Sequence, residues 1–100
     1  ASSASVRDSE LLRNAGHGMS LGGLSVLSLV GSSLASNGAD GLHLMASVAS
    51  VRENTISDNV TFGVFIDAQS LVAGWGNTIS GNGTDTSESV PGELVQPRQE

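Results

Sequence analysis

Four polar side chains could act together as acids, bases or metal ligands: His17, Asp40, His43 and Asp67. His17 and Asp40 stand one repeat of the sequence apart. If the repeats stack as coils, equivalent residues lie about 5 Å apart, so these two side chains can form a charge-assisted pair. On a solvated surface, the same pair would add little stability.

The outward-facing residues of the repeat complete the set of candidate binding residues, which includes Phe65. Ser20, His43 and Phe65 share one column, and one titratable group in three repeats does not make a catalytic acid–base pair. His43 could join His17 and Asp40 as a metal ligand, but no further ligand stands at a fixed spacing. We therefore assign no catalytic residue and expect neither a metal nor a cofactor.

A repeat must position these side chains. Residues 53–59, Glu-Asn-Thr-Ile-Ser-Asp-Asn, recur almost intact at 76–82, and weaker copies end at Asn14 and Asn37. The asparagines that end the four copies recur about every 23 residues, a period typical of solenoids. A second polar column stands five residues before each of them. The predicted inward-facing ladder residues are Asn14, Asn37, Asn54, Asn59, Asn77 and Asn82.

Apolar columns share this period and predict strands. Leucine or isoleucine stands three residues before each of the four asparagines, and glycine stands four residues after the first three. After these glycines, residues 19–21, 42–44 and 64–66 alternate apolar, outward, apolar, which indicates short strands with one buried face. Two further strands per repeat would give a three-sided coil. We expect positive φ at Gly18, Gly41 and Gly63, where the corner turns.

The repeat divides the chain into three parts. Residues 6–83 carry the coils, and the small polar residues 1–5 are predicted to be a frayed lead-in. Residues 84–100 lose the pattern and contain two prolines, so we predict an extended or disordered tail. The alternative is a flap over the open end of the last coil.

Composition restricts the partners. Ten acidic and four basic side chains give a formal net charge of −6, which repels phosphate backbones, so nucleic acid is not expected. The apolar runs are too short to span a membrane. The chain opens at Ala1 partway into a repeat, so we expect a fragment of a longer protein. Its open coil ends would then be covered by flanking coils of that parent or by a second copy in a homo-oligomer.

The columns together resemble a known family. The pattern is apolar, two residues, Asn or Ser, one residue, apolar, two residues, Asn, three residues, Gly, apolar, one residue, apolar. It resembles the right-handed parallel β-helix repeat of pectate lyases, polygalacturonases and phage tailspikes. The resemblance covers about residues 6–83 and implies an all-β solenoid of about three to four coils, each of 22 or 23 residues. It also implies an extracellular or periplasmic location.

Two functions follow from this resemblance. In polysaccharide-active members the site lies on the outer face of the strand after the glycine, where this chain has no acid–base set. We therefore expect a non-catalytic structural or interaction module that presents a surface for protein or glycan contacts. The alternative is part of a polysaccharide-active enzyme of lyase, hydrolase or epimerase type, or its sugar-binding remnant.

Overall fold

The computed structural model describes residues 2–97, which form three parallel sheets of four strands each. The first sheet contains β1 (Ser3–Arg7), β4 (Val26–Val30), β7 (Val48–Arg52) and β10 (Leu71–Trp75). The second contains β2 (Glu10–Leu12), β5 (Ser33–Ala35), β8 (Thr55–Ser57) and β11 (Thr78–Ser80). The third contains β3 (Met19–Leu21), β6 (Leu42–Leu44), β9 (Phe62–Ile66) and β12 (Thr84–Thr86). A short 3₁₀ helix, η1 (Gly92–Val95), follows.

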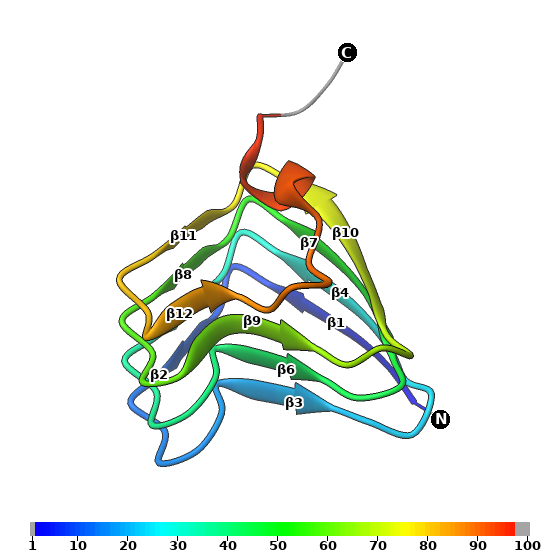
Figure 1. The fold of residues 1–100 in the computed structure, drawn as a ribbon, viewed down its shortest axis with the longest axis horizontal. Helices are drawn as coiled ribbons and strands as arrows, with labels where there is room; N and C mark the ends of the chain where they lie inside the picture. Colours follow the sequence, from blue (N-terminus) through cyan, green and yellow to red (C-terminus); the bar gives the residue numbers. More distant parts are fainter. Residues whose placement is uncertain (1, 98–100) are drawn as a thin grey trace.

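The chain winds through the three sheets in turn, so that each coil adds one strand to each sheet (Figure 1). Every strand pair of the three sheets is parallel and joins residues one period apart, as in Leu11 with Leu34 and Leu34 with Ile56. The predicted columns are therefore the observed register. This confirms the all-β parallel solenoid and the predicted repeat length.

The core lies where the three sheets face each other. Leucine, isoleucine and valine from each sheet fill the middle coils, and Leu29, Leu34 and Leu44 are fully buried. Successive side chains along each short strand point to opposite faces of the sheet. In β6, Leu42 and Leu44 are buried in the core, whereas His43 between them is only partly buried. Burial of these apolar side chains is the main force that holds the coils together.

The predicted asparagine ladder is confirmed. The backbone N–H and the Nδ2 of Asn37 both donate to Oδ1 of Asn59, at 3.1 and 2.9 Å. Asn59 repeats the arrangement with Asn82, at 2.9 and 2.8 Å. In the second column, Asn54 donates in the same way to Asn77. The buried amides thus satisfy one another along the solenoid axis.

The corners depend on a different residue from the one that we predicted. Positive φ occurs directly before each ladder asparagine, at 57° for Arg13, Ser36 and Asp58 and 70° for Gly81. A left-handed residue at this point turns the chain between two strands. Our expectation for the glycines four residues after the asparagines was wrong, because none of them has positive φ within the described residues.

These positions need glycine because a side chain would collide with the next coil. A Cβ at Gly41 would lie 2.7 Å from Nδ2 of Asn59 and 2.8 Å from the carbonyl oxygen of Gly63. A Cβ at Gly18 would lie 2.7 Å from Nδ2 of Asn37. The backbone passes so close to the ladder amide of the next coil that only glycine fits without displacement.

Both ends of the chain differ from the division that the sequence predicts. β1 begins at Ser3, inside the predicted lead-in, because it continues the register of the first sheet, with Ser3 beside Val26. Residues 84–86 pair with β9, inside the predicted tail. η1 then covers the last coil with Leu94, which is fully buried. The flap is therefore the alternative that the structure adopts, and residues 98–100 of the predicted tail lie outside the described residues.

Candidate functional site

The candidate site lies on the outer face of the third sheet. The register of β3, β6 and β9 places Ser20, His43 and Phe65 side by side in one row. His17 comes from the loop before β3, and Asp40 from the equivalent loop one coil later. The sheet therefore brings four of the five predicted binding residues together: His17, Asp40, His43 and Phe65.

Asp40 is the centre of the cluster and is 5% exposed. Its Oδ1 accepts hydrogen bonds from Oγ1 of Thr61 at 2.5 Å and from the backbone N–H of Phe62 at 2.9 Å. Its Oδ2 lies 2.7 Å from Nδ1 of His43 and 3.5 Å from Nδ1 of His17. His17 and Asp40 lie close together as the spacing predicts, and His43 is the closer partner of the Asp40 carboxylate.

Opposing effects act on the Asp40 carboxyl. Burial acts to raise its pKa, because it disfavours the charged form. The hydrogen bonds from Thr61, His43 and the Phe62 backbone, with the nearby His17, favour the charged form and prevail. The pKa of Asp40 is therefore lowered from its ordinary value, and the carboxylate is ionised at neutral pH.

Hydrogen bonding gives the two histidines different roles. An ionised carboxylate only accepts hydrogen bonds, so Nδ1 of His43 carries the proton that it donates to Asp40. Nδ1 of His17 accepts from the backbone N–H of Asp40 at 3.1 Å, so this nitrogen carries no proton in that bond.

The rings form a stack that crosses three coils. The centroids of His17 and His43 are 4.1 Å apart with an interplanar angle of 19°, and those of His43 and Phe65 are 5.0 Å apart with an angle of 14°. Phe62 leans against Phe65 at 5.3 Å. The coil spacing of a parallel sheet is close to the stacking distance of planar rings, so the register itself assembles the stack.

The stack ends beside a hollow of about 490 Å³ at the last coil. Its lining residues are Phe62, Phe65, Ile66, Thr84, Thr86, Ser87, Glu88 and Ser89. Ser87 hydrogen-bonds to both neighbours of Phe65. Its N–H donates to the carbonyl oxygen of Val64, and its Oγ accepts from the N–H of Ile66. The ring stack therefore ends at Phe65, because Ser87 stands at the equivalent position of the next coil and carries no ring.

Asp67 does not join the cluster. It lies after β9, where its carboxylate accepts from Oγ of Ser70 at 2.7 Å and from the backbone N–H of Ala46 at 3.1 Å. The hydrogen bond from Ser70 is the largest of the effects that lower the pKa of Asp67. This residue holds a corner between coils, and we remove it from the candidate binding set.

The geometry favours hydrogen bonding over metal binding. His17, Asp40 and His43 offer ligand atoms within 4.8 Å of one another, a group that could hold an ion. The two rings are stacked, however, so their in-plane lone pairs run side by side and do not converge on one point. Both carboxylate oxygens of Asp40 already accept hydrogen bonds. An ion would have to displace these bonds and turn at least one ring.

Thr61 is the site residue that the sequence analysis missed. It stands two residues after Asn59, where the earlier coils have Gly16 and Ala39. Its hydroxyl gives Asp40 a hydrogen bond that no earlier coil can supply at that place. The sequence did contain a signal for it. Thr61, which has a hydroxyl group, stands one period after Ala39, and Ala39 directly precedes Asp40.

Three stacked parallel sheets around an asparagine ladder define the class of protein as a parallel β-solenoid. A family model described as a right handed beta helix region matches residues 1–90. The chain belongs to this right-handed β-helix family. No curated protein and no solved structure matches the chain. Among the described residues, no helix has the length and apolar character needed to cross a membrane.

Proposed function

We propose that this β-helix module is a non-catalytic binding module, and that it contacts a neutral glycan through the outer face of the third sheet. The observation that carries the proposal is the ring stack that ends at Phe65, beside a hollow lined by hydroxyl groups. A sugar ring has an apolar face that packs on an aromatic ring, and hydroxyls that hydrogen-bond at its edge. The extracellular or periplasmic location is part of the same proposal.

The size and composition of the hollow support a sugar as the ligand. A volume of about 490 Å³ lies within the usual range of small-molecule sites. Four serine and threonine residues line the hollow, Thr84, Thr86, Ser87 and Ser89, of which Ser87 already hydrogen-bonds the backbone of Ile66 through its hydroxyl. A free hydroxyl both donates and accepts, so it suits the mixed hydroxyls of a sugar.

Charge favours a neutral ligand over an acidic one. Glu88 lines the hollow, and the chain has a formal net charge of −6. A uronate or sulfated sugar would meet like charge at this end of the sheet. The module is therefore expected to discriminate against pectate and alginate.

Nuclear magnetic resonance titration tests this proposal. Neutral hexasaccharides (cello-, manno- and xylohexaose) are added to the labelled chain, with hexagalacturonate as the acidic comparison. At least one neutral sugar should shift the amide signals of β9 and β12, and Phe65→Ala should weaken that binding by about tenfold. Leu71→Ala is the matched control, because Leu71 is 69% exposed on the first sheet. Absence of any shift with all three sugars, or equal binding by Phe65→Ala, contradicts the proposal.

One contact favours the enzymatic alternative. Asp40 orients His43 through its Nδ1, which is the arrangement by which a carboxylate fixes the tautomer of a general base. His43 is 22% exposed in its side chain, so a substrate could reach it. Incubation with pectate and alginate, with and without calcium, tests for lyase activity by the ultraviolet absorbance of unsaturated sugar. We expect no absorbance rise, and a rise that His43→Ala abolishes would favour the lyase.

A further inference from the structure

The outer face of the first sheet differs in charge from the rest of this acidic molecule. The chain has ten acidic side chains, yet β1, β4, β7 and β10 contain no aspartate or glutamate, and their charged residues are Arg7 and Arg52. Within the described residues, neither arginine makes an ion pair. The strands of the second and third sheets contain Glu10 and Asp85. Two copies of this chain therefore meet the least charge repulsion across the first sheet.

The register of the first sheet arranges its outward side chains in three rows that run across the coils. The first, which we call the apolar row, is 53, 46 and 69% exposed at Val26, Val48 and Leu71. The second, the small row, contains Ser28, Ser50 and Ala73. The third row contains larger side chains again: Val30, Arg52 and Trp75. A line of large apolar side chains thus runs beside a line of small ones.

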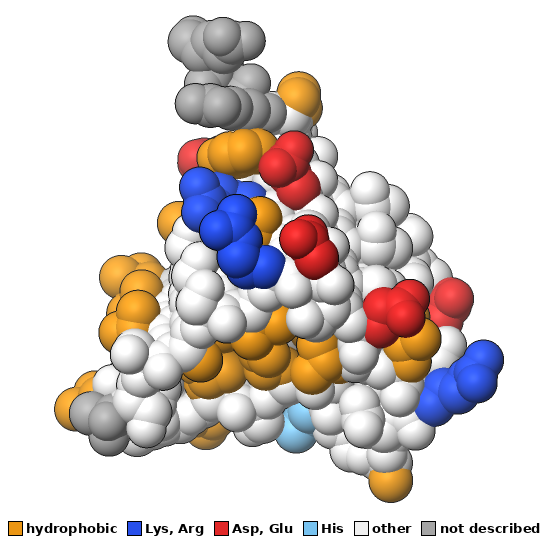
Figure 2. Space-filling model, turned by 180° about the vertical axis from the view of Figure 1, so that it is seen from behind, with side chains coloured by type: hydrophobic (Ala, Val, Ile, Leu, Met, Phe, Trp, Pro, Cys, Tyr) orange, Lys and Arg blue, Asp and Glu red, His pale blue; other side chains and the backbone are white. Residues whose placement is uncertain are grey.

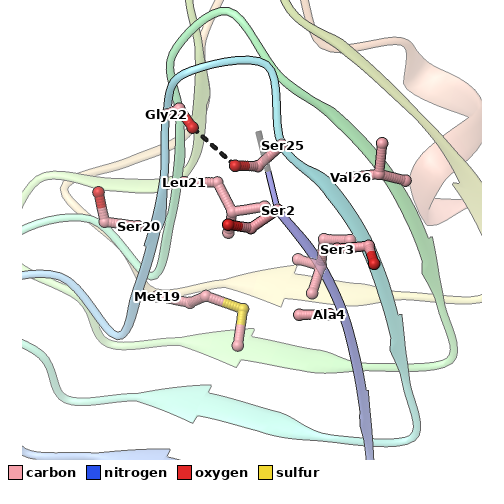
Figure 3. Close-up of a pocket in the computed structure, with 10 residues that line it drawn as sticks. Ser2, Ser3, Ala4, Met19, Ser20, Leu21, Gly22, Ser25 and Val26 are labelled. Carbon is pink, nitrogen blue, oxygen red and sulfur yellow. Dashed lines mark hydrogen bonds between the residues drawn. The ribbon is translucent and has the colours of Figure 1, made fainter.

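The apolar row is part of a larger patch at the corner between the third and first sheets. Eight large hydrophobic residues are exposed among the described residues, and five of them lie in this row or in the adjoining corner loops: Leu24, Val26, Met45, Val48 and Leu71. Hydrophobic side chains gather along this edge of the molecule, on the left in Figure 2. Val26 points away from Met19 and Leu21, to the outside of β4 (Figure 3). A continuous exposed apolar patch of this kind marks an interaction surface.

Leu24, in the corner loop before β4, has an unfavourable backbone conformation. Its φ is 66° and the residue is 73% exposed. The loop is held in this shape, because Leu24 donates its N–H to the carbonyl of Ala46 at 3.0 Å and Ser25 donates its hydroxyl to the carbonyl of Gly22 at 2.7 Å (Figure 3). A bulky residue rarely takes a left-handed conformation, and a side chain so exposed gains little from packing inside the chain. A partner that covers Leu24 would supply the missing contact.

We propose that the outer face of the first sheet binds a second copy of this chain, through a two-fold axis that is parallel to the solenoid axis and lies between the apolar row and the small row. This rotation places the apolar row of each copy on the small row of the other. Val48 then packs on Ser50 of the partner subunit, and the reverse contact is identical. The proposal does not depend on the glycan function, since Phe65 lies on the third sheet.

The shape of the face favours a second copy as the occupant. A two-fold interface requires a patch that is complementary to itself. The coil spacing of about 4.8 Å is the same in both copies, so each coil lies level with the same coil of the partner. Every large side chain of the apolar row then meets a small one. A two-fold axis along the strands would instead set each row against itself, with large side chains against large ones.

The same rotation brings opposite charges together. It sets the third row of one copy against the corner loops of the other, because both lie two residues outside the paired rows. Arg52 then lies opposite Ala46 of the partner subunit. In each chain the N–H of Ala46 donates to the carboxylate of Asp67 at 3.1 Å, so this carboxylate lies beside Ala46. Arg52 therefore gains the acidic partner that it lacks within one chain.

The face is small, so the dimer should be weak. Four strands of five residues cover about 19 by 17 Å, from the strand spacing and the rise per residue. The corner loops add to this area, but the total stays at the low end for specific interfaces. We expect monomers and dimers to exchange rapidly at concentrations of about 10 to 500 μM.

Sedimentation velocity of the full chain, from about 5 to 500 μM, tests the proposal. The average mass should rise toward that of a dimer. Val48→Glu should weaken the association at least about tenfold, because it buries a carboxylate between the two sheets. Val60→Glu is the matched control, since Val60 is 65% exposed and lies outside the first sheet. Thermal melts check that each variant folds like the parent chain.

A charge swap tests the pairing of the rows. Ser50→Arg alone should also weaken the dimer at least about tenfold, because Ser50 lies under Val48 of the partner subunit. An equimolar mixture of the Val48→Glu and Ser50→Arg chains should recover the dimer. In the mixed pair, the new carboxylate of one chain faces the new guanidinium of the other, and the reverse contact between Ser50 and Val48 is unchanged.

Each outcome decides. A dimer that Val48→Glu weakens and the mixture restores supports the proposal. A chain that stays monomeric up to about 500 μM overturns it, as does a dimer that Val60→Glu weakens equally, that Val48→Glu leaves unchanged, or that the mixture does not restore. Flotation with phosphatidylcholine vesicles covers the other occupant of an apolar face. A monomer that binds these vesicles, and loses the binding on Val48→Glu, would make a membrane surface the partner and the proposal wrong.

Discussion

At the residue scale, asparagines of the ladder are four of the eight buried polar residues in the described part of the chain. Asn37, Asn54 and Asn59 are nearly inaccessible to solvent, yet each has its donors and acceptors satisfied by the adjacent coils and by backbone carbonyls. A buried polar group is tolerated when it is fully hydrogen-bonded and is costly when it loses a partner. The stability of the solenoid should therefore be sensitive to single polar residues inside it.

Replacement of Asn59 by alanine should destabilise the chain by about 1 to 3 kcal/mol, because it leaves the N–H and Nδ2 of Asn37 without their acceptor. Denaturant unfolding measures the change. Ser20→Ala, on the outer face of β3, is the control and should cost far less. Equal unfolding midpoints for the two variants would show that the ladder does not stabilise the fold.

Gly41→Ala should cost about 1 to 3 kcal/mol, because the new Cβ would lie 2.7 Å from both Nδ2 of Asn59 and Cγ2 of Ile56. Gly16→Ala is the matched control, since a Cβ at Gly16 meets nothing within 4 Å. Thermal melts of both variants give the comparison. If alanine is tolerated equally at the two positions, the close approach at the corner is not what requires glycine.

Asp40 should make stability depend on acid pH. Its pKa is lowered on folding from an ordinary value of 3.8, so its contribution is fully present above that value and is lost as pH falls through the folded pKa. The Tm difference between the parent chain and Asp40→Asn should thus be largest near neutral pH and shrink below about pH 4. A difference that stays constant down to pH 2.5 would argue against a stabilising carboxylate.

At the element scale, η1 acts as a cap and not as a tail. It lies at the C-terminal end over the last coil (Figure 1), and its backbone carbonyls replace acceptors that a further coil would supply. The cap is built by a four-residue helix and one buried side chain, which is a small structure to close a solenoid. Loss of that side chain should therefore open the last coil.

Leu94→Ala should destabilise the chain by about 2 to 5 kcal/mol, the usual range for a buried leucine. Val95→Ala is the control, because Val95 is 49% exposed in the same helix. Hydrogen exchange should show the largest loss of protection in β10 and β11, which lie under η1. Unchanged protection of these strands in Leu94→Ala would mean that η1 does not close the coil.

At the scale of the whole molecule, stability should vary along the solenoid axis. Each coil contacts only its neighbours, so the middle coils have two partners and the first coil has one. We expect the slowest amide exchange in β4, β5, β7 and β8, intermediate exchange in β10 and β11 under the cap, and the fastest in β1 and β2. Hydrogen exchange of the parent chain measures this order. First-coil amides as protected as those of β4 would contradict it.

The period by itself determined the fold. In a parallel solenoid, residue i must stack on its equivalent one coil later, so the columns at Leu11 and Asn14 already specify register and interior. For the same reason His17 could be paired with Asp40 from spacing alone. The strands, the ladder and most of the candidate site follow from this rule alone.

Only the tertiary structure decided the features that break the period. Ser20 is the equivalent of His43, yet the ring that stacks on His43 is His17, from the preceding loop. Asp85 and Leu94 complete the ladders although neither is a ladder residue, because an oxygen at the right place satisfies an amide whatever its origin. Contacts of this kind depend on where loops and chain ends come to rest in space, and a repeat pattern carries no information about that.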